Sequence, residues 1–91
     1  MRPIYSFRTQ SGSNYRVERM THTGSLSLWK ETPDGYWEPV MGIQSIEGGR
    51  PYVGERAVFH GTDMANRPHY RVSTSPVTEF SIAEIAAIVL D

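Results

Sequence analysis

The sequence predicts a mainly β protein: a small antiparallel β-sandwich or partly open barrel with one short C-terminal helix. Two observations lead to this prediction. From residue 4 to about residue 80, apolar and polar residues alternate in short stretches that Gly, Pro, Asn and Asp interrupt at roughly ten-residue spacing, a pattern typical of antiparallel sheets. Only residues 81–91 place their apolar side chains at helical spacing.

The length and composition predict a single domain that covers residues 1–91. A chain of 91 residues fits one core and buries only a little over ~60% of its unfolded surface. The chain has no Cys, so its stability cannot come from disulfides and it cannot form a thiolate metal site. Its longest apolar run, residues 85–90, is too short to cross a bilayer, and the N-terminus lacks the apolar segment of a secretory signal. We therefore expect a cytoplasmic location and no membrane partner.

The net charge of −1 is unevenly distributed along the chain. Residues 1–30 contain five basic residues and one acidic residue, whereas residues 31–91 contain four basic and nine acidic residues. Such asymmetry can indicate an anionic partner. Within one small domain, basic strands that lie beside acidic strands explain it more simply, and we prefer that interpretation.

Residues 7–17 predict a β-hairpin. A loop at about residues 10–14, with its Gly in the left-handed conformation, would place Phe7 opposite Val17. The alternation then predicts a buried face of Tyr5, Phe7, Thr9, Tyr15 and Val17 and an exposed face of Ser6, Arg8, Arg16 and Glu18. This register also puts Arg8 opposite Arg16, which is unfavourable unless a carboxylate such as Glu18, or a bound anion, neutralises the pair.

Residues 25–40 contain the clearest hairpin signal in the chain. The turn Pro33-Asp34-Gly35 combines a fixed φ, an Asx-type turn and a residue that readily adopts positive φ. The pairs that this turn predicts are Thr32 with Tyr36, Lys30 with Glu38, and Leu28 with Val40.

Two indoles share the other face of this second hairpin. The same register places there Trp29, Glu31, Trp37 and Pro39. A small domain needs its large aromatic side chains inside, so we favour packing of this face into a second layer of the protein's own core. The alternative is that Trp29 and Trp37 form a binding surface.

The second half of the chain predicts further strands. Residues 41–55 are Gly-rich and predict irregular structure. Residues 56–60 and 69–74 predict two strands joined by a loop, and residues 75–82 predict a last strand that Pro76 opens.

Residues 81–91 predict the C-terminal helix. Ser81 and Glu84 have the spacing of a capping box, and the apolar residues that follow Ser81 recur with the helical period. A continued strand is the competing prediction, because Ile and Val are frequent in this segment.

Three segments carry a resemblance to known proteins. Residues 9–17 read TQSGSNYRV, residues 45–61 read SIEGGRPYVGERAVFHG, and residues 70–80 read YRVSTSPVTEF. This pattern resembles small phage and bacterial β-domain proteins that open with a Thr-x-Ser-Gly-Ser-x-Tyr hairpin and close with a Thr-Ser-Pro-Val strand. The matching pieces cover somewhat less than half of the chain. The resemblance implies a compact β domain and a phage setting, and it implies no site residue.

The only concentration of residues suited to catalysis or metal binding is His60, Asp63 and His69. Pairing of His60 opposite His69 would bring both imidazoles to a loop mouth beside Asp63, as a zinc site requires. The spacing is not diagnostic, and solvated histidines at a loop edge explain the pattern better. The chain also lacks the Gly-Lys-Ser/Thr of a phosphate-binding loop. We therefore expect no catalytic, cofactor or metal site.

These observations together predict a small non-enzymatic accessory protein, phage-encoded, that binds a host protein such as a defence component in the host cytoplasm. The two faces that could contact a partner are the arginine face of the first hairpin and the indole face of the second. The candidate interaction residues are Arg8, Arg16, Trp29 and Trp37.

Two alternatives stay open. A small β barrel could bind single-stranded nucleic acid by stacking bases on aromatic side chains beside Arg8 and Arg16. The isoelectric point of about 6.3 argues against this function, since backbone binding depends on neutralising several phosphates. The chain could also be a structural homo-oligomeric phage protein, with a homodimer formed through an edge strand or through the C-terminal helix.

Overall fold

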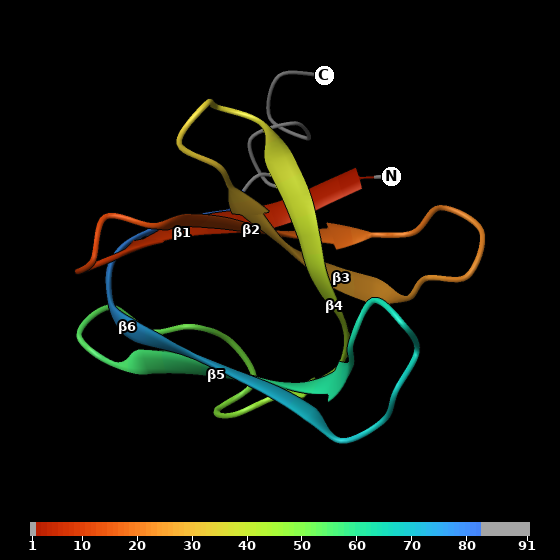
Figure 1. Ribbon diagram of the computed structural model, residues 1–91. Helices are drawn as coiled ribbons and strands as arrows, with labels where there is room; N and C mark the ends of the chain where they lie inside the picture. The colour runs from red at the N-terminus through yellow and green to blue at the C-terminus, as the bar shows by residue number, and fades with distance from the viewer. Residues whose placement is uncertain (1, 83–91) are drawn as a thin grey trace.

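The computed structural model describes residues 2–82, which form six antiparallel strands. Their bounds are β1 Arg2–Thr9, β2 Asn14–Arg19, β3 Leu26–Glu31, β4 Trp37–Ile46, β5 Arg56–Thr62 and β6 Tyr70–Ile82. Each strand pairs with the next one along the chain, and β6 returns to pair with β1, so the sheet closes into a barrel (Figure 1). The mainly β class is confirmed. The sheet is closed, however, where the sequence predicted a sandwich or a partly open barrel.

Closure depends on the long strand β6, which has 13 residues. Its first half pairs with β5 as far as Pro76, and its second half pairs with β1 from Val77 onward. Pro76 has no N–H for the ladder, and its carbonyl accepts a hydrogen bond from the Gln10 N–H at 2.8 Å. The change of partner therefore falls at the residue that cannot donate. The two strands predicted over residues 69–82 are one strand, which changes its pairing partner at this point.

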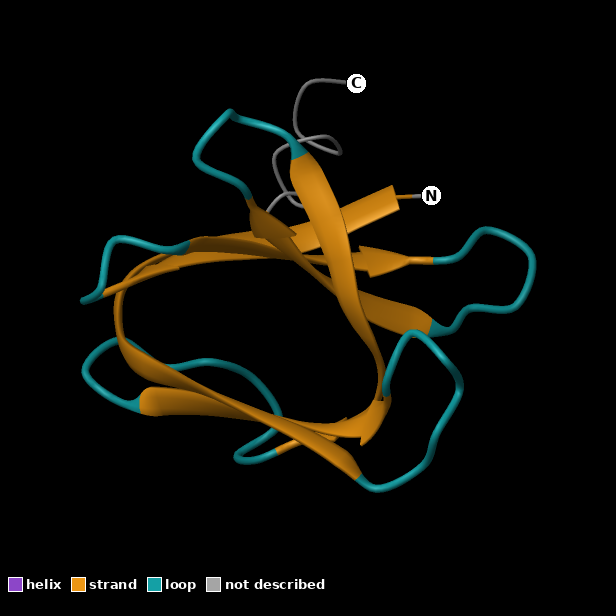
Figure 2. Ribbon diagram, in the orientation of Figure 1, coloured by secondary structure: helices purple, strands orange, loops and turns teal. Residues whose placement is uncertain are grey.

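The first two residues of the predicted C-terminal helix belong to a strand. Ser81 and Ile82 continue β6, so Ser81 is not a helix cap. The rest of the predicted helix, residues 83–91, lies outside the described residues. All regular elements within residues 2–82 are strands (Figure 2). This described segment contains no helix that could span a membrane.

The first hairpin has its predicted faces but a different register. Phe7 lies opposite Tyr15, two residues away from the predicted partner Val17. The turn is tighter than predicted, because the Thr9 N–H already bonds the Ser13 carbonyl at 3.0 Å. A shift of two residues keeps each side chain on the same face, since side chains alternate with a period of two.

This register separates the two arginines of the hairpin. Arg8 lies opposite Asn14, and Arg16 lies opposite Ser6. The predicted Arg8–Arg16 pair is therefore wrong, and the like-charge repulsion that it implied does not arise between directly opposed residues.

The second hairpin forms around the predicted turn. The Thr32 N–H donates to the Tyr36 carbonyl at 2.6 Å, and Gly35 has the positive φ, 88°, that the turn requires. Lys30 lies opposite Glu38 as predicted.

The predicted pairing of Leu28 with Val40 is wrong. Leu28 lies opposite Met41, and a register shift separates this pair from Trp29 opposite Pro39. Val40 is the extra residue on β4 at this shift. A proline interrupts the ladder because it has no N–H, and a bulge beside Pro39 accommodates the interruption.

The Gly-rich stretch at residues 41–55 is irregular only in its second part. Strand β4 extends through Ile46, whereas residues 47–55 form a loop. This loop lies along β6: the Gly54 N–H donates to the Val77 carbonyl, and the Val77 N–H donates to the Glu55 carbonyl, both at 2.8 Å. Strand β5 begins at Arg56 as predicted and ends two residues later than predicted.

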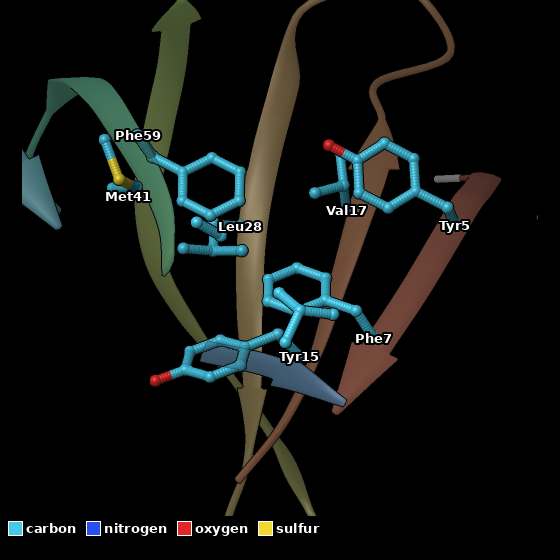
Figure 3. Close-up of a cluster of buried hydrophobic side chains, with 9 residues drawn as sticks. Tyr5, Phe7, Tyr15, Val17, Leu28, Met41 and Phe59 are labelled. Atoms are coloured by element: carbon cyan, nitrogen blue, oxygen red, sulfur yellow. The ribbon is translucent and has the colours of Figure 1, made fainter. Parts of the chain in front are cut away.

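The barrel interior holds the hydrophobic core (Figure 3). The inward residues predicted for the first hairpin are all buried: Tyr5, Phe7, Thr9, Tyr15 and Val17. The Phe7 ring stacks on both Tyr15 and Phe59, with centroids 5.1 and 5.9 Å apart. Leu28, Met41 and Phe59 complete the centre of the core and are fully buried. One closed sheet therefore encloses the core with a single layer of wall.

Candidate interaction surface

The four candidate residues lie on the outside of four successive strands. Arg8 belongs to β1, Arg16 to β2, Trp29 to β3 and Trp37 to β4. Arg16 is directly opposite Trp29 in the ladder. The arginine face and the indole face were predicted as two separate surfaces. In the barrel they form one continuous patch. We refer to these four residues as the β1–β4 surface.

The indoles do not belong to the core. Trp29 and Trp37 are half-buried, and neither is part of the hydrophobic cluster inside the barrel. The Trp29 indole N–H donates to the Ser27 hydroxyl at 2.9 Å, a bond between two outward residues of β3. The preferred prediction, a second core layer over this face, is therefore wrong. A closed barrel has one interior, and the outer face of its wall is not covered by another sheet among residues 2–82.

Arg16 links two parts of this surface. Its guanidinium carbon lies 4.4 Å from the ring centroid of Trp37, a cation–π contact that crosses β3. Its Nε lies 2.5 Å from the Glu18 carboxylate. This contact is an ion pair without hydrogen-bond alignment, because the buried Arg16 Nε–H has no acceptor in hydrogen-bond geometry. Glu18 belongs to the face that was predicted to be exposed, but it is buried. It neutralises Arg16, which is one of the two alternatives that the sequence left open.

A polar hollow opens beside Trp37. Its volume is about 220 Å³, and its outward side chains come from five strands: Arg8, Asn14, Glu31, Trp37 and Glu79. The ladder places Glu79 opposite Arg8, Arg8 opposite Asn14, and Glu31 opposite Trp37, and a side-chain hydrogen bond joins Asn14 to Glu31. The Asn14 amide donates to the Glu31 carboxylate at 3.0 Å and holds it in place.

An apolar hollow of about 410 Å³ lies on the other side of the surface, beside Trp29. Its apolar lining includes Met20, Leu26, Trp29, Pro39 and Met64. Met20 and Met64 are 41% and 58% exposed. Sequence reasoning missed both methionines, because each follows a strand end in a loop and no periodicity connects them; only the barrel brings the two loops together.

The histidines are not brought together. His60 lies opposite Arg71 rather than His69, and its Nε2 is 2.8 Å from the Glu47 carboxylate. Asp63 accepts hydrogen bonds from its own loop: the Arg67 backbone N–H lowers the pKa of this carboxyl most, and the Ala65 N–H and the Arg67 guanidinium lower it further. In the described part of the chain no three His, Asp or Glu side chains are placed to hold a metal ion.

Comparison with known proteins adds no relative. No protein-family model, no curated protein and no solved structure matches this chain. The likeness of residues 9–17, 45–61 and 70–80 to phage and bacterial proteins therefore stays a sequence-based expectation. What the protein does has to be inferred from its own surface.

Proposed function

We propose that this protein is a non-enzymatic binding module that recognises a protein partner through the β1–β4 surface. The observation that carries the proposal is the position of Arg16, Trp29 and Trp37 side by side on the outside of the barrel, between two hollows. Tryptophan and arginine are the residues most enriched among those that dominate the binding energy of protein interfaces.

The core does not require these indoles. The barrel interior is filled by other side chains, so Trp29 and Trp37 add little to the buried core. The neighbouring apolar hollow, with Met20 and Met64 at its rim, exposes further apolar area. Apolar area of this kind, gathered on one face and rimmed by polar groups, is typical of a surface that a partner covers.

The proposed partner is a protein of the bacterial host, such as a defence component in the host cytoplasm. This part of the proposal rests on the sequence resemblance to small phage and bacterial proteins.

Nucleic acid is a weaker candidate for the partner. The two arginines of the surface lie among carboxylates: Glu18 pairs with Arg16, and Glu79 lies opposite Arg8. Nucleic-acid affinity depends on cations that are free to neutralise phosphates. Self-association through an edge strand is also disfavoured, because every strand among residues 2–82 pairs on both sides.

Affinity capture from the host tests the proposal. We expect the tagged protein to retain one stoichiometric host protein, the purified pair to bind in calorimetry, and Trp29→Ala to abolish both results. Tyr70→Ala is the matched control, since Tyr70 is an exposed aromatic residue on β6 that pairs with Gly61 of β5. Capture of no protein by the folded chain, or equal loss in both variants, would refute the proposal. Salt-sensitive binding of a labelled oligonucleotide would support the nucleic-acid alternative instead.

A further inference from the structure

We propose that the polar hollow receives a basic side chain, arginine or lysine, from the protein partner, with Glu31 as its counter-ion and Trp37 as an aromatic wall. This inference rests on the proposed function, because it names the chemistry that the partner must present. It adds a binding subsite at Glu31, a residue that the sequence placed beside the indoles without a role.

Glu31 is a carboxylate of the hollow that has no ion pair in the described part of the chain. Within the described part of the chain, Glu18 pairs with Arg16, and Glu79 lies directly opposite Arg8 in the ladder. No Arg, Lys or His of residues 3–82 forms an ion pair with Glu31. Its only polar side-chain contact there is the Asn14 amide, which binds one carboxylate oxygen at 3.0 Å. The second oxygen is available to a cation, and the half-buried setting strengthens such a pair relative to one in open solvent.

Trp37 supplies the second element of recognition. It lies directly opposite Glu31 in the ladder, so a cation bound to Glu31 is beside the indole. Arg16 already places a guanidinium 4.4 Å from the centroid of this ring. The contact within the protein illustrates the interaction that the partner would add, a cation against an indole.

The size of the hollow matches a side chain rather than a metabolite. Its volume of about 220 Å³ lies below the range of roughly 300–1,000 Å³ that is usual for small-molecule pockets. The head group of one arginine or lysine fits this space with its hydrogen-bonding waters.

Among the residues that the structure describes, Arg8 is the one cation that lines the same hollow. It would repel a second cation if its charge were uncompensated. Glu79 lies opposite it on β6, so the formal charges of Arg8, Glu31 and Glu79 together leave the hollow net negative. The competing outcome, in which Arg8 receives a carboxylate of the partner, makes the opposite prediction for peptide charge and is included in the test.

The test uses the chain's two tryptophans, which give two indole N–H signals in a ¹H–¹⁵N correlation spectrum. The folded protein is titrated with the blocked peptide Gly-Gly-Arg-Gly-Gly and with matched peptides in which citrulline or Glu replaces Arg. We expect the Arg peptide to bind with a Kd on the order of millimolar and to shift the Trp37 signal more than the Trp29 signal. The citrulline and Glu peptides should not saturate.

Variants separate the role of Glu31 from a general charge effect. Glu31→Gln should weaken binding of the Arg peptide at least about fivefold, the effect of losing roughly 1 kcal/mol. Glu38→Gln is the control, because Glu38 is an exposed carboxylate that lies opposite Lys30, on the other face of the hairpin. Equal binding of the citrulline peptide, preference for the Glu peptide, no saturation by any peptide, or equal loss in the two variants would overturn the inference.

These outcomes are distinct from failure of the proposed function. If Trp29→Ala abolishes capture of the host protein while Glu31→Gln does not change its affinity, the binding module stands and the basic-side-chain subsite is refuted. If the chain captures no partner, the proposed function fails whatever the peptides show.

Discussion

The guanidinium of Arg16 lies over the indole of Trp37, with its Cζ 4.4 Å from the ring centroid, and its Nε contacts the Glu18 carboxylate. One side chain from β2 thus contacts β4 across the intervening strand and also neutralises a buried acid. Arg16 therefore contributes to the stability of the barrel wall as well as to the β1–β4 surface.

Replacing Arg16 by Met should destabilise the fold. The Glu18 side chain is only 6% exposed, so the variant leaves a buried carboxylate without its cation, at an expected cost of about 1–3 kcal/mol in the free energy of unfolding. Urea denaturation measures this change. Adding Glu18→Gln to the variant should recover part of the loss.

Arg8→Met is the control for Arg16→Met. Arg8 is exposed, and substitutions at such positions change the unfolding free energy by no more than about 0.5 kcal/mol. Equal effects of the two arginine variants would show that the Arg16–Glu18 pair adds nothing beyond a surface charge.

The alternation of residues was enough to predict the inward face of the first hairpin. Tyr5, Phe7 and Val17 point inward as predicted, because the choice of face depends only on the period of two. The register could not be predicted equally well. The register depends on the length of the turn and on bulges, and the composition around Gly12 is compatible with turns of several lengths. The shift beside Pro39 is of the same kind: the proline signals an interruption, but not on which strand the extra residue lies.

Closure of the barrel and the composition of the surface are properties of the whole sheet. The pairing of β1 with β6 joins residues some 70 positions apart, such as Arg8 and Glu79, and no local pattern encodes it. For the same reason the sequence predicted the four residues of the β1–β4 surface but not their contact, and it missed Met20 and Met64. The indoles were assigned to the core because a two-layer architecture was expected; a single closed wall leaves them outside.

Tyr5 should make stability fall at high pH. Its hydroxyl is buried with no hydrogen-bond partner among the described residues, and burial raises its pKa to about 12, against the opposing charge of Arg50. The folded state holds the phenolic proton more tightly than the unfolded state, so this contribution is complete below pH 10 and is lost as the pH rises toward 12. We expect unfolding free energies to decline by up to about 1.4 kcal/mol per pH unit in that window.

Tyr5→Phe provides the comparison. The variant should be as stable as the parent at pH 7, or more stable by up to about 1 kcal/mol, because it removes an unpartnered buried hydroxyl. It should also lose the decline attributed to Tyr5 above pH 10. In a spectrophotometric titration of the parent, one of the five tyrosines should ionise late. A parent protein whose tyrosines all ionise near pH 10 would contradict the assignment.

Gly61 should tolerate no side chain. A Cβ at this position would lie 1.9 Å from the Gly42 carbonyl oxygen, because β4 and β5 approach closely where their register shifts. The contact is with backbone, so relief requires the two strands to separate. We expect Gly61→Ala to cost about 3 kcal/mol or more, as other severe overpacking does, and to lower the thermal midpoint in circular dichroism strongly.

Gly42→Ala is the matched variant on the partner strand. Its Cβ would lie 2.9 Å from the Thr62 hydroxyl oxygen, which can rotate away. The expected cost is therefore smaller, roughly 1 kcal/mol. If both alanine variants have the same midpoint, the close approach of the strands at Gly61 is not what limits the position.

Thr74 should stabilise the barrel through its hydroxyl rather than through its methyl group. The register of β5 and β6 shifts between Arg56 and Val58, so the intervening Ala57 has no regular partner in the ladder. The Thr74 hydroxyl accepts the Ala57 N–H at 3.1 Å and donates to the Ser75 carbonyl at 2.7 Å. Both Thr74 and Ala57 are buried, so water cannot replace this bond without opening the strand pair.

Thr74→Val keeps the shape of the side chain and leaves the Ala57 N–H unpaired, at an expected cost of about 1–3 kcal/mol. Thr74→Ser keeps the hydroxyl and loses one methyl group, which should cost about 0.8 kcal/mol. We therefore expect the serine variant to be the more stable of the two in urea denaturation, although valine is the more apolar residue. Hydrogen exchange at Ala57 should accelerate in the valine variant alone. A valine variant as stable as the parent would mean that the Ala57 N–H finds another acceptor. The register shift between Arg56 and Val58 would then not depend on Thr74.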